Sequence, residues 1–180
     1  MPANKGYLTA RTDKASDEVY TPAYAVKPII KYIGQANFRT VWCPFDTEQS
    51  EYVKLLRLAG YNVIASHIEN GENFFFYEPE EAYDCIVSNP PFSIKDDVLK
   101  RLAELDKPFA MLLPVPVIQG QKRFDYMKDC QILTFDKRIN YYMDASRTAV
   151  QKGVSFGSLY LCKNFLPKDL IFEVLDVEEK

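Results

Sequence analysis

Four consecutive residues, Asn89, Pro90, Pro91 and Phe92, form the stretch of the sequence best suited to chemistry. They directly follow residues 84–88, a short and mostly apolar run of the kind that forms a buried parallel strand. In an open α/β sheet, ligands bind at the carboxyl ends of the strands. The motif therefore has the position of a binding or catalytic site, although a proline-rich turn without such a role is the alternative.

The side chains of this motif suit a conjugated amino group, whose nitrogen is a poor nucleophile because its lone pair is delocalised. The Asn89 side-chain oxygen can accept one N–H of such a group, and the Pro90 main-chain carbonyl can accept the other. Prolines fix the backbone, so both acceptors are aimed in advance. Phe92 offers a ring on which a base can stack. These residues need no titrating base, so a chain with one histidine is no obstacle.

From residue 20 onward, strand-like and helix-like segments alternate, which indicates an α/β fold with a largely parallel sheet. A helix is expected from Thr21-Pro22 to Gly34, with Pro28 as its start or as a kink. Asp46 or Thr47 is expected to cap a second helix that ends at Gly60, and a third should run from residue 94 to 105. Expected strands are residues 40–45, 62–66, 74–77, 84–88, 109–113, 132–135, 139–143 and 155–161.

The order of these segments around the motif resembles the amino-group adenine methyltransferases, specifically small phage- or prophage-type members. In that family, an Asn/Asp-Pro-Pro-aromatic motif holds the target amine, so the resemblance implies catalytic roles for Asn89 through Phe92. It also implies a Rossmann-like methyltransferase fold, with a mostly parallel central sheet and a β-hairpin toward the C-terminal end. The expected organisation is a flexible lead over residues 1–18, then one domain over residues 19–180 without a separate target-recognition domain.

The resemblance further implies S-adenosylmethionine as the cofactor. One upstream segment resembles the part of the family that folds over the methionine end, and further positions match the ends of the first two strands and the step that holds the adenine ring. The residues implied are Tyr20, Thr21, Pro22, Phe45, Asp46, His67, Ile68, Asn73 and Phe74. Residues 135–142 resemble a hairpin segment that lines the target-base pocket.

Three departures from the family pattern bear on cofactor binding. The turn over residues 44–50 contains no glycine, although glycine lets a backbone approach a ligand closely. His67 stands where the family has a carboxylate for the ribose, and Asn73 replaces an aspartate. Two further hypotheses therefore stay open: a non-catalytic binding or partner module with the same fold, or a methyltransferase for an amide or amine outside nucleic acid.

A nucleic acid, with DNA favoured over RNA, is the expected partner, and a second subunit could supply missing recognition surface. The net charge of −3 argues against strong unaided binding, so local cations would have to contribute. No metal site is expected, because four separated cysteines and a single histidine do not match metal-ligand spacing. A soluble cytoplasmic protein is expected from the absence of a long apolar run. The candidate nucleic-acid contacts are Lys122, Arg123, Lys137, Arg138, Arg147 and Lys152.

Overall fold

The structure, a computed structural model, describes residues 19–143, 146 and 156–177. A seven-stranded sheet crosses this part of the molecule in the order β2-β1-β3-β4-β6-β5-β7. β6 is antiparallel to β4 and β5, and every other neighbouring pair is parallel, which confirms the expected α/β class with a mostly parallel sheet. The strands are β1 (Thr40–Cys43), β2 (Asn62–Ala65), β3 (Cys85–Ser88), β4 (Phe109–Pro114), β5 (Gln131–Phe135), β6 (Ser158–Lys163) and β7 (Leu170–Glu173).

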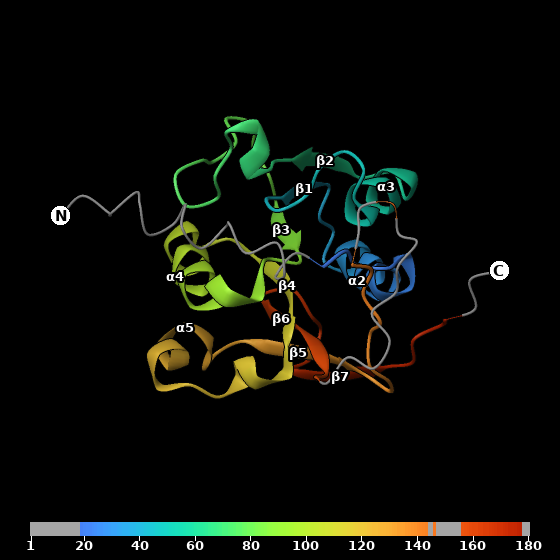
Figure 1. Cartoon of the computed structure of the whole chain (residues 1–180), viewed down its shortest axis with the longest axis vertical. Helices are drawn as coiled ribbons and strands as arrows, with labels where there is room; N and C mark the ends of the chain where they lie inside the picture. Colours follow the sequence, from blue (N-terminus) through green and yellow to red (C-terminus); the bar gives the residue numbers. More distant parts are fainter. Residues whose placement is uncertain (1–18, 144–145, 147–155, 178–180) are drawn as a thin grey trace.

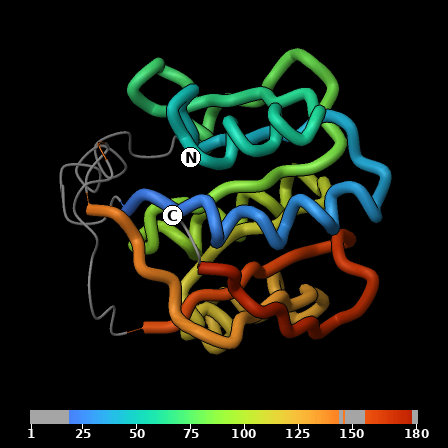
Figure 2. The backbone as a smooth tube through the Cα atoms, turned by 90° about the vertical axis from the view of Figure 1, so that its right-hand side faces the viewer, coloured from blue at the N-terminus to red at the C-terminus, as the bar shows by residue number. Residues whose placement is uncertain are grey.

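Within the described residues, four α-helices flank the sheet: α2 (Ala23–Gln35), α3 (Glu51–Leu58), α4 (Lys95–Leu105) and α5 (Phe124–Met127). Figure 1 shows α2 and α3 on one side of the sheet and α4 and α5 on the other. Figure 2 looks onto the first side, where α2 (blue) crosses the sheet beside α3. Short 3-10 turns occupy η1 (Ile68–Asn70), η2 (Phe92–Ile94), η3 (Val115–Ile118) and η4 (Gln121–Arg123).

Two apolar cores result, one on each face of the sheet, because successive strand residues point to opposite faces. Val41 of β1 joins the core under α2 and α3, while its neighbour Trp42 joins the core under α4. The helix faces follow the expected periodicity: Val26, Ile29 and Ile33 of α2 are all fully buried. The sheet therefore forms the middle of three layers, and its carboxyl-end edge remains for binding.

The helix starts differ from the sequence expectation. The first helix begins at Ala23, with Pro22 rather than Thr21 at the N-cap, and continues through Pro28 without ending there. The cap of α3 is Ser50, whose hydroxyl accepts from the Tyr52 N–H at 3.1 Å. The expected caps at Asp46 and Thr47 are wrong because a turn over residues 47–50 precedes α3, and the Asp46 carboxylate accepts a hydrogen bond from Ser88. The expected end at Gly60 is confirmed by its left-handed φ of 89°.

Two expected strands are absent from the described residues, and one strand was missed. Residues 74–77 form a turn, because the Asn73 carbonyl accepts from the Phe76 and Tyr77 N–H groups at 2.9 and 2.8 Å. Residues 139–143 contribute only an isolated bridge between Tyr142 and Tyr20. The missed strand is β7, which pairs in parallel with β5. The expected hairpin over residues 135–142 is wrong for the described residues, because β5 ends at Phe135 and its antiparallel neighbour β6 begins only at Ser158.

Candidate functional site

The sheet contains a topological switch point between β1 and β3. From β1 the chain moves to β2 on one side, then returns to β3 on the other side and continues to β4. The segments after β1 and β3 therefore leave in opposite directions, and the crevice between them is where open α/β sheets bind ligands. Asp46 follows β1, and Asn89 is the first residue after β3. The structure thus brings two residues predicted from the sequence to one position in the fold.

Asp46 is a buried carboxylate with two hydroxyl donors. Ser50 donates to one of its oxygens and Ser88 donates to the other, both at 2.5 Å. The Asp46 residue is only 8% exposed, and this burial raises the pKa of its carboxyl group from 3.8 to about 6. The two serine hydrogen bonds and the nearby His67 oppose the rise. Asp46 therefore connects the end of β1 to the last residue of β3.

Asn89 presents a buried acceptor. Its side-chain nitrogen donates to the Val19 carbonyl at a long 3.4 Å. Its side-chain oxygen is buried and has no hydrogen-bond partner among the residues that the structure describes. Buried polar atoms are paired in the great majority of cases, so an unpaired one needs a physical reason. This oxygen is the atom that the sequence predicted as acceptor of a substrate N–H.

Aromatic rings surround the last residue of the motif. The Phe92 ring meets Tyr141 edge-on, with 6.0 Å between ring centroids, and meets Phe156 in the same way at 5.5 Å. The Tyr141 hydroxyl donates to Ser158 at 2.7 Å, which fixes that ring from β6. Phe92 is partly buried and contacts both cores. The ring therefore has a packing role, and stacking on a substrate base stays a prediction.

The segment before α2 lies against the motif, as its predicted cofactor role requires. Val19 accepts the hydrogen bond from Asn89, and the next residue, Tyr20, exchanges two backbone hydrogen bonds with Tyr142, at 2.9 and 3.0 Å. Thr21 and Pro22 are buried where the segment enters α2. The upstream segment, the motif and the Tyr141-Tyr142 segment therefore meet in one place, although they are far apart in the sequence.

The other residues predicted for the cofactor lie beyond the ends of β1 and β2. Phe74 is 2% exposed and packs on Phe45, with 4.9 Å between ring centroids. The Asn73 side-chain oxygen accepts from the Phe75 N–H at 3.0 Å. His67 caps η1 by accepting from the Glu69 N–H at 3.3 Å, and Ile68 is exposed. Most of these side chains already have local structural contacts, so their cofactor roles remain predictions.

The predicted nucleic-acid contacts that the structure describes lie in different environments. Lys122 is exposed, whereas Arg123 is engaged inside the protein with Asp96 and with main-chain carbonyls. Lys137 lies 3.3 Å from Asp136, and its neighbour Arg138 is exposed. Arg147 and Lys152 lie outside the described residues, as does the expected lead over residues 1–18.

Three residues of the site were not found from the sequence: Ser50, Ser88 and Phe156, whereas Tyr141 lies in the predicted segment 135–142. Ser50 lies four positions after Asp46, which is a visible local spacing. The other contacts join distant positions, since 42 residues separate Ser88 from Asp46. Such pairs depend on strand order, which single-residue patterns do not reveal.

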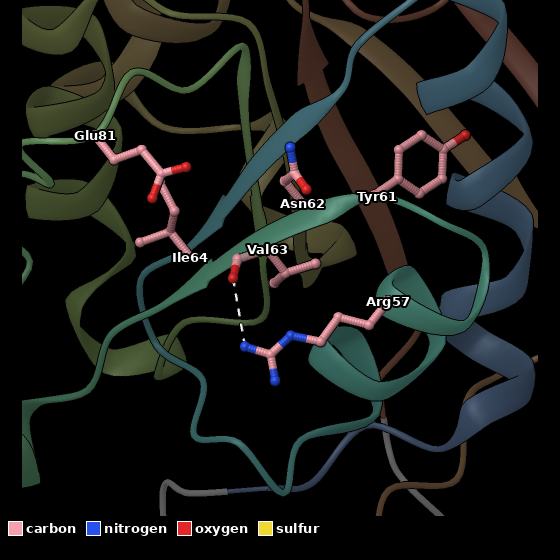
Figure 3. Close-up of a pocket in the computed structure, with 6 residues that line it drawn as sticks. All are labelled: Arg57, Tyr61, Asn62, Val63, Ile64 and Glu81. Carbon is pink, nitrogen blue, oxygen red and sulfur yellow. Dashed lines mark hydrogen bonds between the residues drawn. The ribbon is translucent and has the colours of Figure 1, made fainter.

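A hollow at the β2 edge of the sheet contains none of the predicted residues. It lies along β2, between α3 and the chain near Glu81 (Figure 3). The Arg57 guanidinium donates to the Val63 carbonyl there at 3.4 Å and also pairs with Glu48. This hollow exposes one edge strand and offers no group suited to methyl transfer. Its lining residues are Arg57, Tyr61, Asn62, Val63, Ile64 and Glu81.

The described residues lack two features that would indicate another class of site. No group of three or more histidine, cysteine, aspartate or glutamate side chains there could hold a metal ion. Over the same residues, every helix is too short or too polar to cross a bilayer.

Comparisons with known proteins include a distant structural likeness. No protein-family model matches the sequence, and no curated protein matches it significantly. A similar solved structure is the methyltransferase subunit of a type I restriction-modification system from Streptococcus thermophilus, with a TM-score of 0.49 and 14% sequence identity. The likeness covers 94% of this chain and 50% of that one, so this chain spans about half the length of the subunit. A likeness this distant leaves the activity to be judged from the residues of the site.

Proposed function

We propose that this chain is a methyltransferase that uses S-adenosylmethionine to methylate the exocyclic amino group of adenine in nucleic acid, with DNA favoured over RNA. The observation that carries the proposal is the buried, unpartnered side-chain oxygen of Asn89. An acceptor left unpaired in the described protein is costly, and a substrate N–H would satisfy it. Its position at the switch point of a mostly parallel sheet supports the same function.

In the proposed reaction, the motif holds the target amine rather than deprotonating it. The Asn89 oxygen accepts one N–H and the Pro90 carbonyl accepts the second, so the nitrogen moves toward tetrahedral geometry and its lone pair becomes available. Bound S-adenosylmethionine would supply a methyl group activated by its sulfonium charge, with the methyl C–S bond breaking as the C–N bond forms and a neutral thioether as the leaving group. Neither acceptor is basic enough to keep the proton that the methylated amine must lose, so this proton passes to solvent. The protein's contribution is therefore position and prearranged hydrogen bonding.

The cofactor would lie between the end of β1 and the segment over residues 19–22. The buried Asp46 carboxylate suits a cationic ligand, because a positive charge nearby would offset the cost of its burial. His67 is close enough to Asp46 to lower the pKa of its carboxyl group and offers ring nitrogens to a hydroxyl. Tyr20, held by the bridge to Tyr142, would close the crevice from the other side.

A second candidate is a binding or partner module that shares the fold but does not transfer methyl groups. The specific observation in its favour is that both oxygens of Asp46 already accept internal hydrogen bonds. The turn over residues 44–50 also lacks glycine, which would allow the closest approach of a ligand to the backbone. In this candidate, Asp46 and its two serines stabilise the crevice instead of binding a cofactor.

Calorimetric titration with S-adenosylmethionine and with its demethylated product tests the two candidates. Binding, followed by transfer of labelled methyl groups to DNA, RNA or protein, supports the methyltransferase and identifies its substrate class. Asn89→Ala should then abolish transfer without changing cofactor affinity. The matched control is Asn62→Ala, which removes an exposed amide at the distant sheet edge. Absence of binding at millimolar cofactor would reject the methyltransferase and favour the partner module.

A further inference from the structure

Arg123 is bound into the protein rather than presented to solvent. Its Nε donates to the Asp96 carboxylate at 2.7 Å, and its Nη1 lies within hydrogen-bond distance of the carbonyls of Pro116, Val117 and Gln119, at 3.2, 3.3 and 2.8 Å. The side chain is 13% exposed. These carbonyls lie in η3 and just after it, so one guanidinium satisfies acceptors that the short helix leaves open. A phosphate contact would require this arrangement to be broken.

Gly120 fits closely against the same guanidinium. A Cβ atom at residue 120 would lie 2.8 Å from the Arg123 Cζ and 2.9 Å from its Nη1. A flexible side chain could normally move away, but here the guanidinium is held by a carboxylate and several carbonyls. Residue 120 therefore has no room for a side chain while Arg123 keeps its contacts.

The segment that Arg123 organises, residues 114–123, is attached to both sides of the Asn89–Phe92 motif. On one side, Asp96 lies in the first turn of α4, which follows the motif directly. On the other side, the Val115 N–H donates to the Gly157 carbonyl at 2.8 Å, and the adjacent Phe156 ring packs against Phe92. The conformation of this segment is thus coupled to the motif through two separate contacts.

We propose that Arg123 is a positioning residue, which holds residues 114–123 in place beside the target pocket so that their exposed side chains contact the nucleic acid next to the methylated base. This inference rests on the proposed function and replaces the direct phosphate contact expected from the sequence. Ile118, Gln119 and Lys122 are exposed on this segment and would face the substrate. Arginine is required because its planar fork can bond a carboxylate and several carbonyls at once, which a lysine cannot do.

The test compares Arg123→Lys, Gly120→Ala and Asp96→Asn with the wild-type chain. Gly120→Ala leaves Arg123 present but displaces its guanidinium and also strains the backbone, whose φ at residue 120 is 159°, so it perturbs the same segment without removing a charge. Lys128→Ala is the control, because it removes an exposed ion pair with Asp125 in the same region. Hydrogen exchange of the amides in residues 114–123 is measured first. The three test variants should lower protection about 10- to 100-fold, as expected from losing hydrogen bonds to a charged group.

Kinetics then separate positioning from direct contact. The KM for the nucleic acid should rise about tenfold or more in all three variants, because misplaced binding groups lose productive geometry. Cofactor affinity should stay as in wild type. A direct phosphate contact predicts instead that Arg123→Lys retains nucleic-acid binding, because lysine keeps the positive charge at this position. That result would overturn the inference, as would unchanged protection, or lost protection with unchanged KM.

Failure of the proposed function is distinguishable from failure of this inference. If wild-type protein transfers no methyl group, KM is replaced by the dissociation constant for a single-stranded DNA oligonucleotide, measured by fluorescence anisotropy. Weakened binding in the three variants, together with reduced protection, would still support the positioning role. Wild-type-like DNA binding in these variants would reject that role whatever the activity.

Discussion

The Ser88 hydroxyl, at the end of β3, donates a 2.5 Å hydrogen bond to the buried carboxylate of Asp46, just after β1. These residues lie on the two strands that flank the switch point. The motif starts at the residue after Ser88, so the bond connects the position of Asn89 to the first half of the sheet. Several measurable consequences depend on the protonation and the hydrogen bonds of this carboxylate.

The first prediction concerns pH. Burial raises the pKa of Asp46 from 3.8 to about 6, so between these values the folded state binds more protons than the unfolded state. The contribution of Asp46 to stability is therefore fully present below pH 3.8 and falls as the pH rises toward 6, by about 3 kcal/mol in all. The free energies of unfolding of wild type and Asp46→Asn should be measured by urea denaturation from pH 3 to 8. The difference between them should change as the pH rises toward 6 and become constant above about pH 7.

Asp84 provides the control of opposite sign for that experiment. Its carboxylate accepts from the Arg39 and Thr40 N–H groups at 2.7 and 2.9 Å, and the Thr40 bond, followed by the Arg39 bond, lowers its pKa. Its contribution is present above pH 3.8 and is lost as the pH falls through its lowered pKa. If Asp46→Asn and Asp84→Asn changed the pH dependence of stability in the same direction, the conclusion that burial raises the pKa of Asp46 would be wrong.

The second prediction is that Asn89→Ala stabilises the protein or leaves its stability unchanged, while abolishing methyl transfer. The buried oxygen that this substitution removes has no partner in the described protein, and such atoms cost about 1–3 kcal/mol. The lost bond to Val19 is long and contributes little. Thermal unfolding and labelled-methyl transfer should be measured on the same sample. A large loss of stability would mean that this oxygen is satisfied within the folded chain.

The third prediction separates the two donors to Asp46. Both Ser50→Ala and Ser88→Ala should raise the pKa of Asp46 further, because each hydrogen bond favours the charged form. Only Ser50 also caps α3, so Ser50→Ala should lose about 1 kcal/mol more stability. Comparing the two unfolding curves at pH 4 isolates the cap, since Asp46 is then largely protonated in the folded state. Equal losses there would argue against the cap.

The fourth prediction concerns the upstream segment. Tyr20→Ala should raise the dissociation constant of S-adenosylmethionine without lowering the maximal turnover on saturating substrate. The backbone bridge to Tyr142 does not require the Tyr20 side chain, so the segment should stay in place. Calorimetric titration measures the effect, and Tyr61→Ala, which removes a tyrosine ring from the hollow beside β2, is the control. Unchanged cofactor affinity would remove Tyr20 from the proposed site.

Periodic segments could be predicted from the sequence, whereas pairings between distant residues could not. The helix faces of α2 and α3 were recognisable because apolar residues repeat at helical spacing. Residues 74–77 were mistaken for a strand because four aromatic residues suggest a pleated surface. In the structure, Phe74 packs against Trp42 while Asn73 closes a turn. Tertiary packing thus overrode the local preference.

The part of the candidate site that lies in one local motif could be predicted from the sequence. Asn89 through Phe92 stand out because they follow a buried strand, and the structure confirms that strand as β3. The role of Arg123 was not predictable, because its acceptors are main-chain carbonyls and a carboxylate 27 positions away. From the sequence alone, an arginine that contacts a ligand at the surface cannot be distinguished from one held in an internal hydrogen-bond network.

The position of β6 affects the order in which the sheet can be completed during synthesis. β6 lies between β4 and β5 but comes after both in the chain. Until residues 158–163 leave the ribosome, β4 and β5 both lack the strand that lies between them. The edge of β4 is then unpaired, and β5 cannot join the sheet. Long-range pairing of this kind slows folding and prolongs exposure of unpaired strand edges. A nascent chain halted before β6 should therefore be the form that chaperones bind most strongly.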